Sequence, residues 1–199
     1  MERFNGIAAS RGVAIGKLHF FGNCQRPVQL ARSDSPEREL ERFESARLRA
    51  LKTLDDLHTQ AVERVGPEDS MIFGVQQALL NDRDYISGVR DLINQEHYVA
   101  EYAVQRTGER LAQMISQLDN VYLQERSSDL LDISGRVVRQ LNGELARDLS
   151  DIQGQVVLAA QDLLPSETVQ LDQSKVQAFV TGGGSRTSHA SILSRTMGI

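Results

Sequence analysis

The feature that most constrains this chain is the block of residues 33–143, in which apolar side chains recur with the period of an α-helix. Its start, Ser33-Asp34-Ser35-Pro36-Glu37, sets cap-forming residues before a proline and a glutamate, which predicts a helix N-terminus. Gly66-Pro67 and Asn142-Gly143 predict helix ends. Long amphipathic helices joined by short turns favour an antiparallel bundle.

Five helices are expected in this block, and turn residues separate each from the next. The second helix follows Gly66-Pro67, and its apolar residues are expected to face the bundle interior. This inward set is Met71, Ile72, Val75, Ala78 and Leu79. The five expected ranges are 36–65, 68–80, 82–94, 99–118 and 122–141.

The sequence on either side of the block alternates between strand and helix signals. Short apolar runs separated by turn residues are typical of an α/β domain. Strands are expected within residues 13–21, 155–160 and 176–181, and helices at 165–171 and 190–197.

These patterns predict a helix-dominated chain with an α/β domain formed by two separate segments. Residues 1–32 and 144–199 are expected to pack together, and the bundle of residues 33–143 is expected to be inserted between them. The last residues, SILSRTMGI, predict a helix and the beginning of something more. We therefore expect the α/β domain to be incomplete at its C-terminal side.

Composition excludes several kinds of function. The chain of 199 residues carries 22 Lys and Arg against 27 Asp and Glu, so it lacks the basic surface that sequence-independent nucleic-acid binding needs. The single cysteine, Cys24, excludes an intrachain disulfide and a cysteine-based structural zinc site. No apolar run is long enough for a membrane span, and the first residues lack the charged-then-apolar pattern of a secretory signal. The cytoplasm is the expected compartment.

The strongest chemical signal is Gly182-Gly183-Gly184-Ser185-Arg186-Thr187-Ser188-His189, between an expected strand and an expected helix. Glycines let a ligand approach the backbone closely, and a helix N-terminus offers free N–H groups to an anion. A histidine at this junction is a candidate nucleophile for phosphoryl transfer, and Arg195 on the same helix is a candidate for charge compensation. The alternative is an ordinary capped turn with an incidental histidine.

Five segments together resemble a known family. The segment GSRTSHASILSR resembles the phosphohistidine motif GGxTSHAAIxAR of the phosphoenolpyruvate-utilising enzymes. Four more resemble Enzyme I of the bacterial phosphotransferase system, and they follow one another in the family's order. They are GIAASRGVAIGK (6–17), MIFGVQQALLNDRDY (71–85), YLQERSSDLLDISGR (122–136) and LAAQDLLPSETVQL (158–171).

The resemblance implies an α/β phosphohistidine (swivelling) domain in which His189 carries the phosphoryl group on Nε2. It implies that Thr168 lies near His189 and hydrogen-bonds to it. Ser185 stands where the family usually has a glycine, which leaves the loop conformation open. The residues expected to support His189 are Thr168, Gly184, Arg186, Thr187, Ser188 and Arg195.

The resemblance also implies that the helical block docks the phosphocarrier protein HPr. Mixed acidic and apolar residues suit a basic partner, because charge steers the encounter and apolar contact anchors it. Gly74 and Gln76 make this face less charged than in relatives. The expected docking residues are Glu68, Met71, Leu79, Asp82, Asp84 and Arg126.

The family's remaining domains are expected to lie outside this chain. They bind phosphoenolpyruvate and Mg²⁺ and form the dimer, so we expect this chain to be a monomer that exchanges phosphate with HPr without using phosphoenolpyruvate. No metal or cofactor is expected within it, because no acidic cluster accompanies His189. Two alternatives remain: the swivelling domain of another enzyme of the class, such as pyruvate–phosphate dikinase or phosphoenolpyruvate synthase, and a non-catalytic interaction module.

Overall fold

The computed structural model describes residues 5–22, 27–144, 152, 154–184, 186 and 188–199, and helices dominate them. The chain divides into two compact units. The first comprises Met1–Gln25, Thr59–Ser70 and Arg147–Ile199, and the second comprises Arg26–His58 and Met71–Ala146. The sequence-based domain limits remain a prediction, and they differ from these units in two respects. They place Thr59–Ser70 with the helical block, whereas this segment groups with the first unit. They place residues 26–32 and 144–146 with the α/β domain, whereas these residues group with the second unit.

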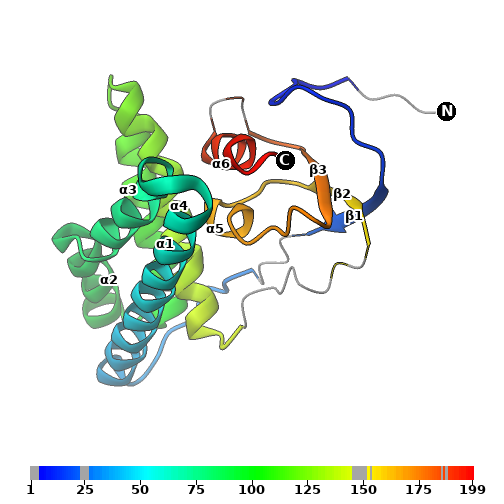
Figure 1. Cartoon of the computed structure of the whole chain (residues 1–199). Coiled ribbons are helices and arrows are strands. Elements are labelled where there is room, and N and C mark those ends of the chain that lie inside the picture. Colours follow the sequence, from blue (N-terminus) through cyan, green and yellow to red (C-terminus); the bar gives the residue numbers. More distant parts are fainter. Residues whose placement is uncertain (1–4, 23–26, 145–151, 153, 185, 187) are drawn as a thin grey trace. The chain divides into compact units, whose positions relative to one another are not determined.

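Nine helices and strands follow one another along the described chain (Figure 1). No helix in the described ranges is long and apolar enough to cross a membrane. In chain order the elements are β1 (Lys17–Phe21), α1 (Pro36–Leu80), α2 (Arg83–Glu96), α3 (Ala100–Ser116), α4 (Val121–Leu141), β2 (Val156–Ala160), α5 (Pro165–Thr168), β3 (Val176–Thr181) and α6 (His189–Met197).

Helix α1 contains a kink where the sequence predicts an end. Gly66 is non-helical, with φ 87° and ψ 172°, and Pro67 follows it. Proline has no N–H to donate and its ring clashes with the preceding turn, so the two expected helices meet here at a bend. The interruption is confirmed, but no loop separates the two parts.

The inward face predicted after the kink is partly wrong. Ile72 is buried as expected, whereas Met71 is 64% exposed and Ala78 is also exposed. The buried face also contains Phe73 and Leu80. These larger side chains set the rotation of the helix, and they turn Met71 and Ala78 away from the core.

Gln76 belongs to the same buried face. Its side chain is 0% exposed, and its Nε2 donates to Asp132 Oδ2 of α4 at 2.9 Å. The expectation that Gln76 contributes to a docking face is therefore wrong. A buried amide that bonds a buried carboxylate holds α1 against α4, because either group left alone would lose its hydrogen bond inside the core.

Helix α2 has clear signals at both ends. The Asp82 carboxylate caps its start by accepting from the N–H groups of Asp84 (2.8 Å) and Tyr85 (3.1 Å). His97 ends it in the left-handed conformation, with φ 58°. Helix α3 then packs against both α2 and α4, as expected for consecutive helices joined by short turns.

Helices α3 and α4 approach most closely at Gly108. A Cβ atom at this position would lie 2.1 Å from Ser134 Oγ, so only glycine fits without movement. The Ser134 hydroxyl donates to Leu130 O, which makes the buried Tyr85 hydroxyl the donor in the 3.1 Å bond between the two side chains. Burial raises the pKa of Tyr85, so its hydroxyl remains a proton donor throughout the physiological range.

The first unit contains a parallel three-stranded sheet in the order β1-β2-β3. Strand β1 pairs with β2 from Lys17–Val156 to Phe21–Ala160. The expected strand at residues 13–16 does not form, and Val13 and Ile15 are exposed. Both β2 and β3 match their predicted ranges closely, and α5 packs against α6.

Gly108→Ala is expected to destabilise the protein by about 1–3 kcal/mol, because the added methyl group overlaps Ser134. Gly74→Ala is the matched control, since a Cβ atom at residue 74 would meet nothing within 4 Å and α1 is helical there. Alanine at residue 74 is expected to be neutral or to stabilise by up to about 1 kcal/mol. Urea unfolding measures both free energies, and equal effects of the two substitutions would contradict the close approach.

Candidate functional site

The loop between β3 and α6 is fixed by backbone contacts at its glycines. The N–H of Gly182 donates to Ala160 O at 3.0 Å, and the N–H of Gly183 donates to Gln161 O at 2.9 Å. A Cβ atom at Gly182 would lie 2.8 Å from Gln161 Oε1, and Gly184 has φ +97°. The first glycine therefore allows a close approach, and Gly184 supplies a conformation that other residues rarely adopt.

His189 is the first residue of α6, one position earlier than the helix start predicted from sequence. Ser188 is the N-cap, and its Oγ accepts from the Ser191 N–H at 3.3 Å. The first N–H groups of a helix have no intrahelical acceptor, and they carry a partial positive charge. The half-buried His189 is thus attached directly to an end of a helix that favours an anion.

Arg195 turns back from α6 toward the loop. Its Nη1 donates to Arg186 O at 2.7 Å and to Ala9 O at 3.1 Å. The guanidinium therefore ties α6, the loop and the N-terminal segment together. The side chain of Arg186 is exposed, whereas Ser185 and Thr187 lie outside the described residues.

Thr168 lies at the end of α5, the short helix that packs against α6. Its side chain is fully buried, and its Oγ1 donates to Leu164 O at 3.0 Å. Both Thr168 and His189 are described, and no hydrogen bond joins their side chains. The Thr168 oxygen retains the capacity to accept a proton from an imidazole N–H, so the expected bond remains a prediction.

Two polar side chains of α1 explain why the segment Thr59–Ser70 belongs to the first unit. Arg64 Nη1 donates to Val169 O at 2.8 Å and to Leu171 O at 3.2 Å. Asp69 Oδ2 accepts from Thr196 Oγ1 of α6 at 2.7 Å. Sequence analysis missed these contacts because residues far apart in the chain supply the two sides of each bond.

The residues predicted to dock a partner differ in how available they are. Glu68, in the first unit, is exposed, and so is Met71 in the second. Leu79 is half-buried, and Asp84 is exposed. The Asp82 carboxylate is exposed but also caps α2.

Arg126 is engaged within α4. Its Nη1 lies 3.1 Å from Oδ2 of Asp129, a carboxylate that is almost completely buried. This ion pair holds the Arg126 side chain near the helix surface. Its predicted role in docking remains a prediction.

Within the described ranges, no group of three or more histidine, cysteine, aspartate or glutamate side chains is placed to hold a metal ion. The polar groups that the structure describes on the loop and at the start of α6 are the Ser188 and Ser191 hydroxyls, backbone amides and the Arg195 guanidinium bonded to Arg186 O. This arrangement is suited to receiving an anion.

Two family models match the chain. Residues 5–126 match the family described as PEP-utilising enzyme, N-terminal, and residues 152–199 match that described as PEP-utilising enzyme, mobile domain. The chain belongs to this family of phosphoenolpyruvate-utilising enzymes. The second match contains the glycine loop, Ser188 and His189.

Three curated relatives of this family member share one name. Phosphoenolpyruvate-protein phosphotransferase of Bacillus sp. (strain S) is 33% identical over 198 residues, covering 100% of this chain and 34% of the relative. The Bacillus subtilis protein of the same name is 32% identical over 199 residues, covering 100% and 35%. The Haemophilus influenzae protein is 34% identical and covers 97% and 34%. The chain spans about a third of the length of these relatives.

Solved structures show the same relationship. A solution structure of Enzyme I (nEIt) matches with a TM-score of 0.81 at 32% identity, covering 98% of this chain and 79% of that chain. The N-terminal domain of Enzyme 1 - Nitrogen matches with a TM-score of 0.67 at 25% identity, covering 96% and 79%. The recognition of Enzyme I from its sequence motifs is confirmed.

Gly184→Ala is expected to destabilise the first unit by about 1–2 kcal/mol, because its φ of +97° strains any residue with a Cβ atom. Gly183→Ala is the matched control. Its φ lies outside the positive range, and a Cβ atom there would make only an ordinary contact, at 3.6 Å from Gln161 O. Thermal unfolding compares the two variants. A Gly183→Ala loss equal to that of Gly184→Ala would contradict the role assigned to Gly184.

Proposed function

We propose that this chain is a cytoplasmic phosphoryl relay of the sugar phosphotransferase system, in which His189 exchanges a phosphoryl group with a histidine of HPr. One observation carries the proposal. His189 opens α6 directly after a glycine loop, in a chain that aligns from end to end with phosphoenolpyruvate-protein phosphotransferases. The names of these relatives support the reaction class, and the geometry supports the residue.

The transfer requires an in-line nucleophile and stabilisation of charge. As the His189 Nε2–phosphorus bond forms, the phosphorus–nitrogen bond to the HPr histidine breaks, and the released imidazole recovers its neutral form by taking up the proton that His189 gives up. The phosphoryl oxygens on His189 are then close to the N–H groups at the start of α6. Ser188 holds this helix end, and Arg195 holds the loop that precedes it.

Thr168 is proposed to orient the His189 ring. Its hydroxyl proton is committed to Leu164 O, so the oxygen is left to accept from the ring N–H at Nδ1. Such a bond fixes the tautomer in which Nε2 carries the attacking lone pair.

Phosphoenolpyruvate use, Mg²⁺ binding and dimerisation are proposed for the part of the longer relatives that this chain does not span. The chain on its own is expected to be monomeric and to need no metal for exchange with HPr. Autophosphorylation from phosphoenolpyruvate should fail with these residues alone.

Two other functions compete with this proposal. A swivelling domain of another phosphoenolpyruvate-utilising enzyme would share His189 but would not exchange phosphate with HPr. A non-catalytic module would bind HPr without forming a phosphohistidine. The Enzyme I match over both units favours the relay over either one.

Incubation with phospho-HPr is expected to place an acid-labile, base-stable phosphoryl group on the chain. His189→Ala should abolish the adduct, because no other ring nitrogen occupies the start of α6. Intact-protein mass spectrometry at alkaline pH measures it. His58→Ala is the control, because His58 lies in the second unit, and this variant should retain full labelling. If His189→Ala formed the adduct in undiminished yield, the proposal would be wrong.

HPr is proposed to contact the exposed residues Glu68 and Met71 and the acidic residues near the start of α2. Met71 is 64% exposed, which leaves its flexible thioether side chain available to a partner. The exposed Asp84 carboxylate of the same unit would help to steer a basic protein.

Met71→Ala is expected to weaken HPr binding by about tenfold, the effect of losing one well-packed apolar anchor. Met114→Ala is the matched control, because Met114 is 58% exposed in the same unit and lies outside the predicted docking set. Isothermal titration calorimetry gives both affinities. An unchanged affinity in Met71→Ala would place the HPr contact elsewhere.

A further inference from the structure

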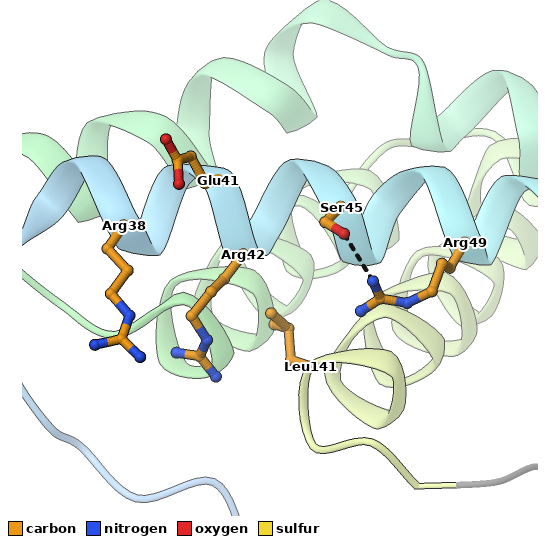
Figure 2. A pocket seen from close by; sticks show the side chains of 6 residues that line it. All are labelled: Arg38, Glu41, Arg42, Ser45, Arg49 and Leu141. Carbon is orange, nitrogen blue, oxygen red and sulfur yellow. Dashed lines mark hydrogen bonds between the residues drawn. The ribbon is translucent and has the colours of Figure 1, made fainter.

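A cleft in the second unit has no role in the proposed relay. It has a volume of about 440 Å³ and lies between α1 and the end of α4 (Figure 2). Five of its six lining residues are polar or charged. The lining residues are Arg38, Glu41, Arg42, Ser45, Arg49 and Leu141.

The arginines follow the spacing of one helix face. Arg38 and Arg42 are four residues apart, and Arg49 follows two turns later on the same side of α1 (Figure 2). Like charges at this spacing repel one another on a helix surface. Whether the charge of each guanidinium is compensated therefore depends on which groups lie beside it.

Arg42 has its charge compensated within the bundle. Its Nη1 lies 2.6 Å from Glu39 Oε2, and its Nη2 forms a second ion pair with Glu101 of α3. These two carboxylates satisfy the face of Arg42 that points into the protein. The side chain of Arg42, the middle arginine of the three, is thus held in place by two ion pairs.

Among the described residues, the side chain of Arg49 is held in place by neutral groups alone. Its Nη1 donates to Ser45 Oγ at 2.7 Å, its Nε to Gln140 Oε1 at 3.2 Å and its Nη2 to Gln140 O at 3.1 Å. The bond to Ser45, one turn earlier, draws the guanidinium back toward Arg42 (Figure 2). The structure therefore orients this cation without cancelling its charge.

Arg38 has neither a hydrogen-bond partner nor an ion-pair partner for its side chain among the residues that the structure describes. It projects to the same side of α1 as Arg42 (Figure 2). Glu41 is the one carboxylate in the lining. Two guanidiniums thus remain uncompensated at the two ends of the cleft.

We propose that this cleft binds a small oligophosphate, a ligand with at least two linked phosphate groups. The planar donor fork of arginine matches phosphate oxygens, and linked phosphates offer a separate set of oxygens to each of the two guanidiniums. The volume suits a small ligand, and the single apolar residue, Leu141, provides no anchor of the kind a peptide interface needs. The proposal does not depend on the phosphoryl relay.

Inorganic pyrophosphate and the diphosphate of a nucleotide share this chemistry. Calorimetric titrations of the whole chain at low salt with pyrophosphate and with ADP distinguish the sources. Equal affinities for the two ligands would show that the phosphate groups alone determine binding. Tighter binding of ADP would show that the cleft also recognises the nucleoside part of a nucleotide. Either result supports the proposal.

Arg38→Gln and Arg49→Gln are each expected to weaken pyrophosphate binding about tenfold or more, as for a lost charge-assisted hydrogen bond. Glu41→Gln should strengthen it, because a negative charge leaves the lining. Arg106→Gln is the matched control, since Arg106 is an exposed arginine of α3 in the same unit, outside the cleft, and its variant should bind as the native chain does.

Arg49 also ties α1 to α4, so its variant is assessed together with a thermal melt. Arg38 makes no such tie, and Arg38→Gln remains informative even if Arg49→Gln unfolds. Absence of pyrophosphate and ADP binding at millimolar concentration would overturn the proposal. An equal loss of pyrophosphate affinity in Arg106→Gln would also overturn it. Binding of an acidic peptide when neither pyrophosphate nor ADP binds would overturn it too.

Discussion

The pairing of β1 with β2 is the constraint on which the rest of the structure depends. These strands are parallel neighbours, yet residues 22–155 separate them, and helices α1–α4 occupy most of that interval. A parallel pair usually needs only one crossover helix. The next crossover, from β2 to β3, is short, and the Gly182 N–H returns to Ala160 O at the carboxyl end of β2. His189 therefore follows the carboxyl edge of the sheet, where parallel α/β proteins place their ligands.

Much of this fold could be predicted from local signals. Pro36, Asp82 and the glycine after α6 mark helix ends through interactions within a few residues, and β3 is a compact apolar run. The rotation of the helix after Gly66 could not be predicted in the same way. Gln76 faces the core because Asp132 is there to pair with it, and no apolar period signals such a pair.

The candidate site also combines features that local sequence signals predict with contacts between distant residues that they do not. The motif around His189 identifies the loop, the cap and the candidate nucleophile from neighbouring residues. The motif also predicts Arg195 as a candidate for charge compensation, but its bond to Ala9 joins residues far apart in the chain and could not be predicted. The arginine cleft was missed entirely, because its net charge depends on tertiary contacts. Arg42 pairs with a carboxylate of another helix, whereas Arg49 bonds the neutral Gln140. Sequence spacing shows the row of arginines but not their partners.

The contact at Gly108 has a consequence for how this bundle can change over evolutionary time. A larger residue at position 108 requires a smaller one at position 134, but removing the Ser134 hydroxyl leaves the buried Tyr85 hydroxyl without its acceptor. Tyr85 would then have to become phenylalanine. Substitution of this one glycine therefore affects side chains on three helices, because Gly108 contacts Ser134 and Ser134 bonds Tyr85. Residues 85, 108 and 134 are therefore expected to change together among related sequences.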